Sequence, residues 1–550
     1  YPVGTNWAPG VTFHHRDHLD EVQRELREWK GVSVLIYDQT CAAEKRRRRK
    51  RGTYPDPAKR VFINEAVCEG CGDCSVKSNC LSVVPVETEF GRKRAIDQSS
   101  CNKDFSCLNG FCPSFVTVEG GALRKGKAAA KKSEGVATQE PELPPAPAIP
   151  SVEGKPYGVL ITGIGGTGVV TIGAIMGMAA HIEGKGATVL DQLGMAQKGG
   201  AVISHVRIGA TPEALHAVRL AAGGADALLG CDLVVSASPD ALARLEPGAS
   251  KAIVNTHETI TGEFTRHPDL AFPANTLRLS VEAAAGPDAV DFLDATAIAT
   301  ALMGDSIATN MFVLGYAFQK GLIPLAAESI ERAIELNGAA VPMNLAAFRW
   351  GRRAAHDLAA VEKLIAPPKG NGDNVVAFTR SAPKTLDEIV ASRVKHLTGY
   401  QNAALAGRYK ALVDKVRAAE QKTGLAGLAE AVAHNYAKLL AYKDEYEVAR
   451  LYADAAFQAR LGQQFDGDYR LKFHLAPPLL ASRDPRTGQL QKQEFGAWML
   501  PAFRMLAKLK GLRGTAFDLF GYTEERRTER RLIADYEALC AELLAGLSAE

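Results

Sequence analysis

Apolar residues recur every three or four positions between Leu19 and Trp29, which predicts a helix near the start of the chain. Asp17 stands where it can cap this helix. Gly31 then separates it from the apolar run 32–37, which predicts a strand. One helix and one strand cannot bury a core by themselves, so we interpret this segment as the end of an α/β domain.

A different pattern begins after residue 156, where short apolar runs alternate with longer amphipathic stretches. The runs are residues 159–162, 187–190, 201–206 and 233–237. Strands that alternate with helices in this way predict an α/β unit with a largely parallel sheet.

Two breaks divide the chain. Residues 124–156 are rich in Lys, Ala, Glu and Pro, with six prolines between 141 and 156, a composition typical of an extended linker. The second break is Pro-Pro-Lys-Gly-Asn-Gly at 367–372. Beyond it Thr385 can cap a helix, and apolar spacings of three and four continue to the C-terminus, so the last third is predicted to be mostly helical.

The size and charge of the chain narrow its possible functions. Its 550 residues suggest three or four folded units at about 150 residues each. Because 65 basic residues nearly balance 62 acidic ones, the net charge of +3 gives no reason to expect nucleic acid or an anionic membrane as a partner. Seven consecutive basic residues, 45–51, form a local solvated or phosphate-facing segment.

Residues 156–180 carry no charge and are about as long as the ~20 residues of a spanning helix. Seven glycines in this run fit a strand, a tight turn and a helix better, so we expect no membrane span.

The cysteines are strongly clustered, because seven of the ten fall between Cys68 and Cys112. Such clustering in a long chain favours metal ligation over disulfides and indicates a reducing, cytoplasmic location. The spacing of Cys68, Cys71 and Cys74 is typical of three ligands to a 4Fe-4S cluster. The fourth ligand is expected to be Cys112, which precedes a proline as in ferredoxins, with Cys80 as the alternative.

Three further cysteines leave the number of clusters open. Cys80, Cys101 and Cys107 could contribute to a second cluster, although their spacing departs from the ferredoxin pattern. The alternative is a structural zinc ribbon. A zinc ribbon uses two separate Cys-x2-Cys pairs, whereas here the two pairs share Cys71 and form a continuous triple. One relay cluster is therefore the prediction, and it implies an oxidoreductase.

A glycine-rich loop follows the first strand of the α/β unit and opens a helix. It contains Gly163, Gly165, Gly166 and Gly168, and Asp191 ends the next apolar run, as in a dinucleotide fingerprint. Free amides at a helix N-terminus attract any phosphate or carboxylate, so the pattern alone does not define the ligand.

A second polar, glycine-rich segment, residues 192–200, contains Gln197 and leads into a strand that carries His205 and Arg207 on one face. These residues are candidates for ligand contacts near the first glycine loop. The alternative is that His205 and Arg207 form an ordinary exposed strand face.

Three stretches together resemble the single-chain indolepyruvate ferredoxin oxidoreductases of bacteria: the cysteine-rich segment, the loop 163–168 and the segment 194–207. Residues 40–52, 441–450 and 512–522 also resemble that family. The resemblance implies the C-terminal end of a thiamine-diphosphate domain at 1–60, a small ferredoxin-like iron-sulfur segment at 61–123, a linker at 124–156, a gamma-type α/β domain at 157–370 and a helical C-terminal domain at 371–550.

The resemblance also implies an activity, the oxidative decarboxylation of an aryl 2-oxoacid such as indolepyruvate to acyl-coenzyme A, with single electrons passing through a 4Fe-4S cluster to ferredoxin. Its implied substrate or coenzyme A contacts are Gly163, Gly165, Gly166, Gly168, Gln197, His205 and Arg207. The chain lacks the Gly-Asp-Gly and Asn pair that holds thiamine diphosphate and Mg²⁺, so these cofactors are expected in upstream domains and the chain alone should be inactive. A homo-oligomer is expected.

Two alternatives remain open. The chain could be a non-catalytic subunit for electron transfer and assembly. It could also be an iron-sulfur NAD-dependent dehydrogenase, in which Asp191 would bind a ribose.

Overall fold

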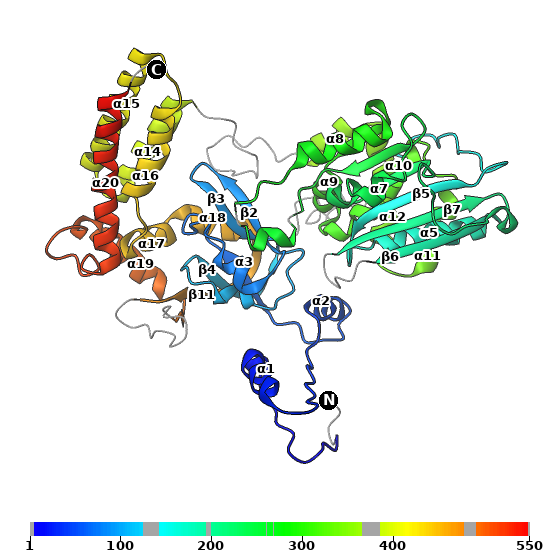
Figure 1. Cartoon of the computed structure of the whole chain (residues 1–550), viewed down its shortest axis with the longest axis horizontal. Coiled ribbons are helices and arrows are strands. Elements are labelled where there is room, and N and C mark those ends of the chain that lie inside the picture. The colour runs from blue at the N-terminus through cyan, green and yellow to red at the C-terminus, as the bar shows by residue number, and fades with distance from the viewer. Residues whose placement is uncertain are drawn as a thin grey trace. The chain divides into compact units, whose positions relative to one another are not determined.

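The computed structural model of the chain describes residues 5–124, 142–193, 200–259, 261–267, 269–365, 385–477 and 491–547 (Figure 1). It divides into two compact units. The first comprises Tyr1–Pro57 with Asn102–Asp104, and the second Ala58–Cys101 with Phe105–Glu550. The predicted linker overlaps residues 125–141, which lie outside the described ranges.

The first unit contains η1 (Arg16–His18), α1 (Leu19–Glu28) and α2 (Ala42–Lys50). The predicted helix is confirmed as α1, but its N-cap is His18, and Asp17 lies in η1 instead. The predicted strand 32–37 is wrong: the segment is irregular and Val32 is 98% exposed, because no described strand of this unit offers it backbone hydrogen bonds. Most of the basic run lies in α2, where Glu44 pairs with Arg47 and Arg48.

The larger sheet of the second unit has six strands in the order β10-β9-β8-β5-β7-β6. They are β5 (Tyr157–Ile164), β6 (Gly186–Leu193), β7 (Ala201–Gly209), β8 (Ala227–Gly230), β9 (Lys251–Asn255) and β10 (Val290–Leu293). Strands β5, β8, β9 and β10 are parallel, while β7 is antiparallel to both β5 and β6. The predicted α/β sheet is therefore confirmed, with a mixed edge.

The fourth predicted strand, 233–237, is wrong. These residues form α6 (Leu233–Ser236), and the strand of this part of the chain is β8, which ends just before them. The Asp232 carboxylate accepts a hydrogen bond from the amide of Val235 at 2.9 Å and so caps the helix. The capping residue Asp232, directly before the apolar run, thus favours a helix over a strand at 233–237.

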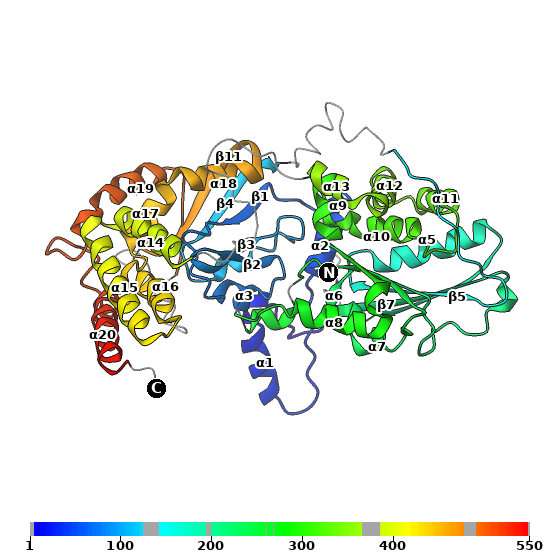
Figure 2. The same ribbon diagram turned by 90° about the horizontal axis from the view of Figure 1, so that it is seen from above.

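Helices cover both faces of this sheet. One face carries α5 (Val169–Ile182), α9 (Ala295–Met303), α10 (Thr309–Gln319), α11 (Ala327–Asn337), α12 (Val341–His356) and α13 (Leu358–Ile365). The other carries α6, α7 (Pro239–Leu242) and α8 (Ala274–Ala285). Figure 2 shows α10, α11 and α12 on one side of β5 and α7 and α8 on the other. Short 3-10 turns join them: η4 (Pro212–Ala214), η5 (Gly262–Thr265), η6 (Pro287–Ala289) and η7 (Ser306–Ala308).

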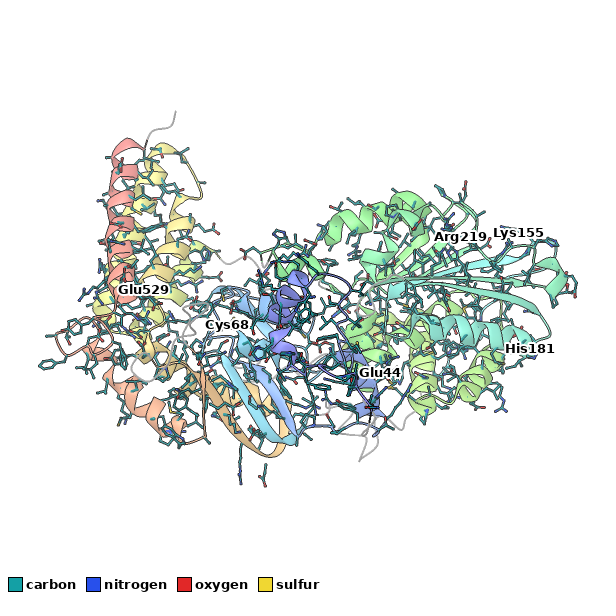
Figure 3. The ribbon with its side chains drawn as sticks, turned by 60° about the horizontal axis from the view of Figure 1, so that its bottom comes forward. Glu44, Cys68, Lys155, His181, Arg219 and Glu529 are labelled. Atoms are coloured by element: carbon teal, nitrogen blue, oxygen red, sulfur yellow. The ribbon has the colours of Figure 1, made fainter. Side chains whose placement is uncertain are left out.

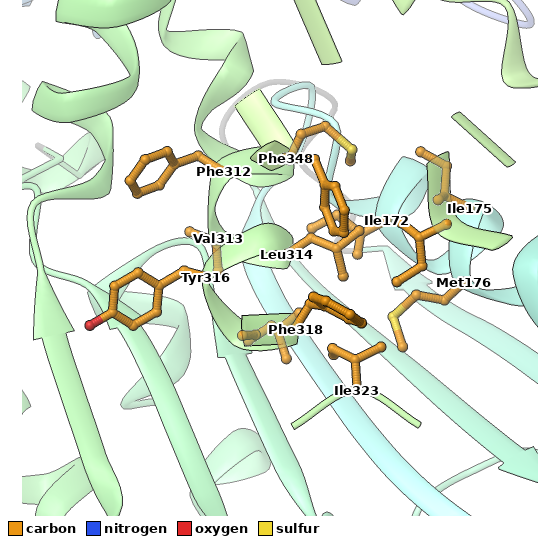
Figure 4. Packing of buried hydrophobic residues seen from close by; sticks show 14 of the residues in the cluster. Ile172, Ile175, Met176, Phe312, Val313, Leu314, Tyr316, Phe318, Ile323 and Phe348 are labelled. Carbon is orange, nitrogen blue, oxygen red and sulfur yellow. The ribbon is translucent and has the colours of Figure 1, made fainter. Parts of the chain in front are cut away.

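The core beneath α10 is closely packed (Figure 4). Phe312 and Phe318 of α10 and Phe348 of α12 are at most 1% exposed and belong to the same buried cluster as the apolar residues of α5. A Cβ on Gly315 would lie 1.9 Å from the carbonyl oxygen of Phe348, so only glycine lets α10 and α12 approach this closely.

A second sheet joins distant parts of the sequence in the order β1-β4-β11-β12. Its strands β1 (Lys59–Ile63), β4 (Phe115–Leu123), β11 (Phe465–Leu475) and β12 (Gln493–Phe495) are all antiparallel. The hairpin β2 (Val83–Thr88) and β3 (Gly91–Ile96), with α3 (Asp73–Ser78) and η2 (Ser106–Asn109), completes the cysteine-rich segment. Helices α17 (Glu445–Ala453), α18 (Ala455–Gln464) and α19 (Met499–Lys508) share a core with the second sheet.

The remaining C-terminal helices form a bundle of α14 (Leu386–Tyr400), α15 (Ala403–Thr423), α16 (Leu428–Leu440) and α20 (Glu524–Gly546), with η8 (Leu509–Leu512) after α19. The predicted cap at Thr385 is confirmed as a capping box, in which Thr385 and Glu388 satisfy each other's backbone amides. No helix among the described residues has the length and apolar character that crossing a membrane requires.

Candidate functional site

The first cysteine loop turns sharply after β1. The amide of Cys68 donates to the carbonyl of Asn64 at 2.9 Å, and the amide of Gly70 donates to the Cys68 Sγ at 3.3 Å. Gly70 has a φ of +74°, and a Cβ on it would lie 2.1 Å from the carbonyl oxygen of Arg92. Glycine is therefore required here, since the loop that presents Cys68 and Cys71 passes directly against β3. Figure 3 labels Cys68 in this part of the chain.

The loop that contains Cys112 packs on the helix that contains Cys74. A Cβ on Gly110 would lie 3.0 Å from the Cα and Cβ of Cys74, and the amide of Phe111 donates to the Asp73 carboxylate at 2.9 Å. These contacts join segments about 40 residues apart and bring Cys112 to the first three cysteines.

Electrostatic interactions group four of the thiols. Burial, together with smaller contributions from Cys112, Cys68 and Cys71, raises the pKa of Cys74 to about 12. Burial is also the main cause of the raised pKa of both Cys68 and Cys71, and Cys112 adds to each. Cys112, the fourth ligand expected from the sequence, thus interacts with all three members of the spaced motif.

The other three cysteines of the segment form a second group. Burial raises the pKa of Cys107, and the next largest contributions come from Cys80 and Cys101, followed by Cys74. Cys80 therefore interacts with Cys107, whereas the thiols that raise the pKa of Cys74 are those of Cys112, Cys68 and Cys71.

Two cationic side chains of β3 lie near the first group. Lys93 and Arg94, on β3, are 7% and 0% exposed. Burial lowers the pKa of Lys93 to about 8, although Glu69 and Cys68 favour its charged form. Burial likewise lowers the pKa of Arg94, while Cys74 and Cys68 oppose the shift. Buried cations beside thiols compensate the negative charge that the thiols carry as metal ligands.

The donor set fits a 4Fe-4S cluster. Among the described residues, no three His, Cys, Asp or Glu side chains converge on a site for a single metal ion. A four-iron cluster requires a wider arrangement, because each of four thiolates binds a different iron, and backbone amides that donate to sulfur stabilise it. Four coupled thiols, the Gly70 amide on Cys68 and the neighbouring cations supply these features.

The glycine-rich loop forms the predicted strand-turn-helix unit. Gly166 and Gly168 have φ values of +87° and +101°, and Gly168 is the N-cap of α5. The amide of Gly165 donates to Gly200 at 2.7 Å, and the Asn310 side chain donates to the carbonyl of Thr167 at 3.0 Å. The turn is thus held from both sides at the carboxyl end of β5.

His205 and Arg207 lie elsewhere on the sheet. In β7 they pair with Leu160 and Gly158 of β5, well before the glycine turn. His205 is 1% exposed and accepts from the amide of Leu220 at 3.3 Å; burial lowers its pKa to about 4, with Arg219 and Arg244 contributing. Arg207 donates to the carbonyl of Ala217 at 3.1 Å. Gln197 lies outside the described residues.

Polar residues missed in the sequence lie at the carboxyl edge of the parallel strands. His257 and Asp294 follow β9 and β10, and their side chains are 3.2 Å apart; the hydrogen bond to Asp294 is the main cause of the raised pKa of His257. Asn255 links this edge to β8 by donating to the carbonyl of Cys231 at 3.0 Å. The sequence did contain a signal for this pair, namely a polar residue soon after each buried strand. Ligands of parallel α/β sheets bind at the carboxyl edge of the strands, where such residues lie.

The comparisons with known proteins agree with this architecture. Residues 158–354 match the model of the family described as pyruvate ferredoxin/flavodoxin oxidoreductase. Residues 386–550 match a family of unknown function, DUF6537. Indolepyruvate oxidoreductase subunit IorB of Methanothermobacter thermautotrophicus is 30% identical over 204 residues, which are 36% of this chain and 97% of that subunit. The IorB subunit of Archaeoglobus fulgidus is 27% identical over 203 residues, 36% of this chain and 94% of that subunit.

The chain belongs to the 2-oxoacid:ferredoxin oxidoreductase family, in which it is similar to the IorB subunits, as the sequence resemblance implied. Among solved structures it is similar to the gamma subunit of the keto/oxoacid ferredoxin oxidoreductase of Geobacter sulfurreducens, at 23% identity and a TM-score of 0.26 over 36% of this chain and 98% of that one. It is also similar to the 2-oxoglutarate:ferredoxin oxidoreductase of Magnetococcus marinus, at 16% identity and a TM-score of 0.27 over 37% of this chain and 32% of that one.

Proposed function

We propose that this chain is the electron-relay part of an indolepyruvate, or related aryl 2-oxoacid, ferredoxin oxidoreductase. The observation that supports the proposal is the packing of the Cys112 loop on the helix of Cys74, through the close approach of Gly110 to Cys74 and the hydrogen bond from the Phe111 amide to Asp73. Bound there, a 4Fe-4S cluster would accept and pass on one electron at a time. Ferredoxin, a one-electron acceptor, is the partner that this chemistry requires.

In this proposal the α/β domain binds the acyl acceptor, coenzyme A, or the 2-oxoacid at the carboxyl edge of its parallel strands. The glycine turn Gly163–Gly168 lies at this edge and presents the N-terminus of α5, which favours anionic groups. The His257 and Asp294 pair lies at the same edge. His205 and Arg207, although expected as contacts, bind neighbouring backbone and are better explained as support for the strand.

Thiamine diphosphate and Mg²⁺ belong, in this proposal, to upstream domains. The first unit supports this assignment because it exposes large apolar side chains: Phe13 (69%), Trp29 (67%), Val32 (98%) and Val34 (76%). Apolar exposure of this extent marks a surface that another domain covers.

The nicotinamide alternative loses its main support in the sheet topology. In a dinucleotide-binding unit the strand after the first helix is parallel to the first strand and presents its acidic residue beside the glycine turn. Here β6 runs in the same direction as β5, but the antiparallel strand β7 lies between them. Asp191 of β6 therefore pairs with Ser204 of β7, one strand away from β5 and its glycine turn. We therefore assign no dinucleotide to Asp191.

Electron transfer tests the function. The anaerobically purified chain is reduced with dithionite, freed of excess reductant and mixed with oxidised ferredoxin, while EPR follows both centres. Rapid reoxidation of the chain, lost in Cys74→Ser, is the expected result. No transfer to ferredoxin, or instead transfer to NAD⁺ that Asp191→Ala abolishes, would refute the proposal.

A further inference from the structure

The C-terminal segment 386–550, which matches a family of unknown function, binds both cysteine loops through their backbone. Lys443 donates to the carbonyl of Cys68 at 3.2 Å and pairs with Glu69. Lys492 donates to the carbonyl of Cys112 at 3.4 Å. Tyr452, which is fully buried in α17, donates from its hydroxyl to the carbonyl of Pro113 at 2.6 Å.

The same segment holds the hairpin between β2 and β3. Ser392 of α14 donates to the Glu89 carboxylate at 3.0 Å. The Arg393 guanidinium lies 4.1 Å from the ring centroid of Phe90, and the His396 ring is 4.9 Å from it. Since β11 also pairs with β4 over most of its length, residues 386–550 and the cysteine-rich segment share a sheet, a core and loop contacts.

Lys492 contacts the Cys112 loop directly through the Cys112 carbonyl. Burial lowers the pKa of its ammonium group, while Cys112, Cys107, Cys74 and Asp73 all favour its charged form. It also lies 4.8 Å from the ring centroid of Phe115, a residue with no exposed surface. A cation held among thiols in a partly buried site is weakly screened by solvent, so its charge acts strongly on them.

We propose that residues 386–550 complete the iron-sulfur unit, and that Lys492 acts as a positioning residue that raises the reduction potential of the cluster. The inference rests on the proposed function, because it needs a cluster at Cys68, Cys71, Cys74 and Cys112. Reduction adds one negative charge, which a fixed neighbouring cation stabilises, so the reduced form gains more from Lys492 than the oxidised form does. A segment of unknown function thereby sets the driving force for electron transfer to ferredoxin.

The test is an EPR-monitored redox titration of the whole chain. Lys492→Gln removes the charge but keeps a donor for the Cys112 carbonyl, and Lys492→Arg keeps the charge. The matched control is Lys472→Gln: Lys472 pairs with Glu119 and Glu494, at 2.8 and 3.3 Å, rather than with the cysteine loops. We expect Lys492→Gln to lower the equilibrium constant for reduction about tenfold, or about 59 mV for one electron, while Lys492→Arg and Lys472→Gln stay near the wild type.

The outcomes separate this inference from the function on which it rests. Wild-type chain without iron would refute the proposed function. Full iron content in Lys492→Gln with less than a twofold change in the equilibrium constant would overturn the inference alone. Lys492→Gln could instead lose its iron. In that case, Lys492→Arg that keeps its iron and the wild-type reduction potential supports a charge effect. Loss of iron in both variants shows that Lys492 only holds the Cys112 loop by packing, and overturns the inference.

Discussion

Gly70 allows a direct test of how the cysteine loop is built. Its φ of +74° disfavours any other residue, and a Cβ would lie 2.1 Å from the carbonyl oxygen of Arg92, a backbone atom of β3 that cannot move alone. In Gly70→Ala, left-handed backbone costs about 1–2 kcal/mol. Relief of the steric overlap costs about 1–3 kcal/mol more. The expected loss is therefore about 2–5 kcal/mol, concentrated where Cys68 and Cys71 bind iron.

Gly91 provides the matched control. Its φ is +87°, it starts β3 one residue before Arg92, and a Cβ there would meet nothing within 4 Å. Gly91→Ala should therefore cost only the backbone term, about 1–2 kcal/mol. Native-state hydrogen exchange of β1 and β4 measures the local free energy of opening, and iron analysis measures the loss of the cluster. Equal stability and equal iron content in the two variants would refute the reasoning.

Three other predictions concern the rest of the chain. Arg513 and Asp444 form a buried pair, 2% and 3% exposed and joined by two hydrogen bonds, so Arg513→Met should cost about 3–5 kcal/mol in hydrogen exchange of α17, since an unpaired carboxylate remains. Arg417→Ala, which breaks the exposed pair of Arg417 and Asp387, should cost far less because solvent screens that pair, and equal costs for the two substitutions would contradict this. Burial lowers the pKa of His205 to about 4, below its unfolded value of about 6.5, so the unfolded chain binds more protons between these two pH values. The stability that neutral His205 contributes is therefore present above about pH 6.5 and is lost as the pH falls toward 4. In urea titrations the stability difference between wild type and His205→Gln should shrink over this range, and a constant difference would exclude this role. Because Thr385 caps α14, Thr385→Ala should lower the free energy of opening of the first turn of this helix by about 1 kcal/mol, as measured by hydrogen exchange. Thr398→Ala is the control, because Thr398 lies inside the same helix and bonds only the carbonyl of Val394.

Local signals in the sequence predicted local structure well. The strand, glycine turn and helix around Gly163–Gly168 and the cap at Thr385 depend on neighbouring residues, and both form as expected. The group of Cys68, Cys71 and Cys74 follows from their spacing, which brings them onto one short loop and helix.

Features that depend on distant contacts could not be predicted in this way. The run 32–37 has strand-like residues but no described strand of its unit to pair with, and 233–237 is capped into a helix by Asp232. The pairing of β4 with β11 joins residues more than 300 positions apart, so no local pattern indicates it. Lys492 follows the same pattern: it reaches Cys112 because β12 pairs with β11, so its place beside the cysteine site could not be predicted from the sequence.

The most direct test of the central claim is iron and acid-labile sulfide analysis of the anaerobically purified chain, with EPR after reduction by dithionite. Cys112→Ser and Cys80→Ser are compared in parallel. The account predicts about four irons and one reducible 4Fe-4S signal, strongly reduced in Cys112→Ser and retained in Cys80→Ser. Zinc in place of iron, or a signal that depends on Cys80 and not on Cys112, would contradict it.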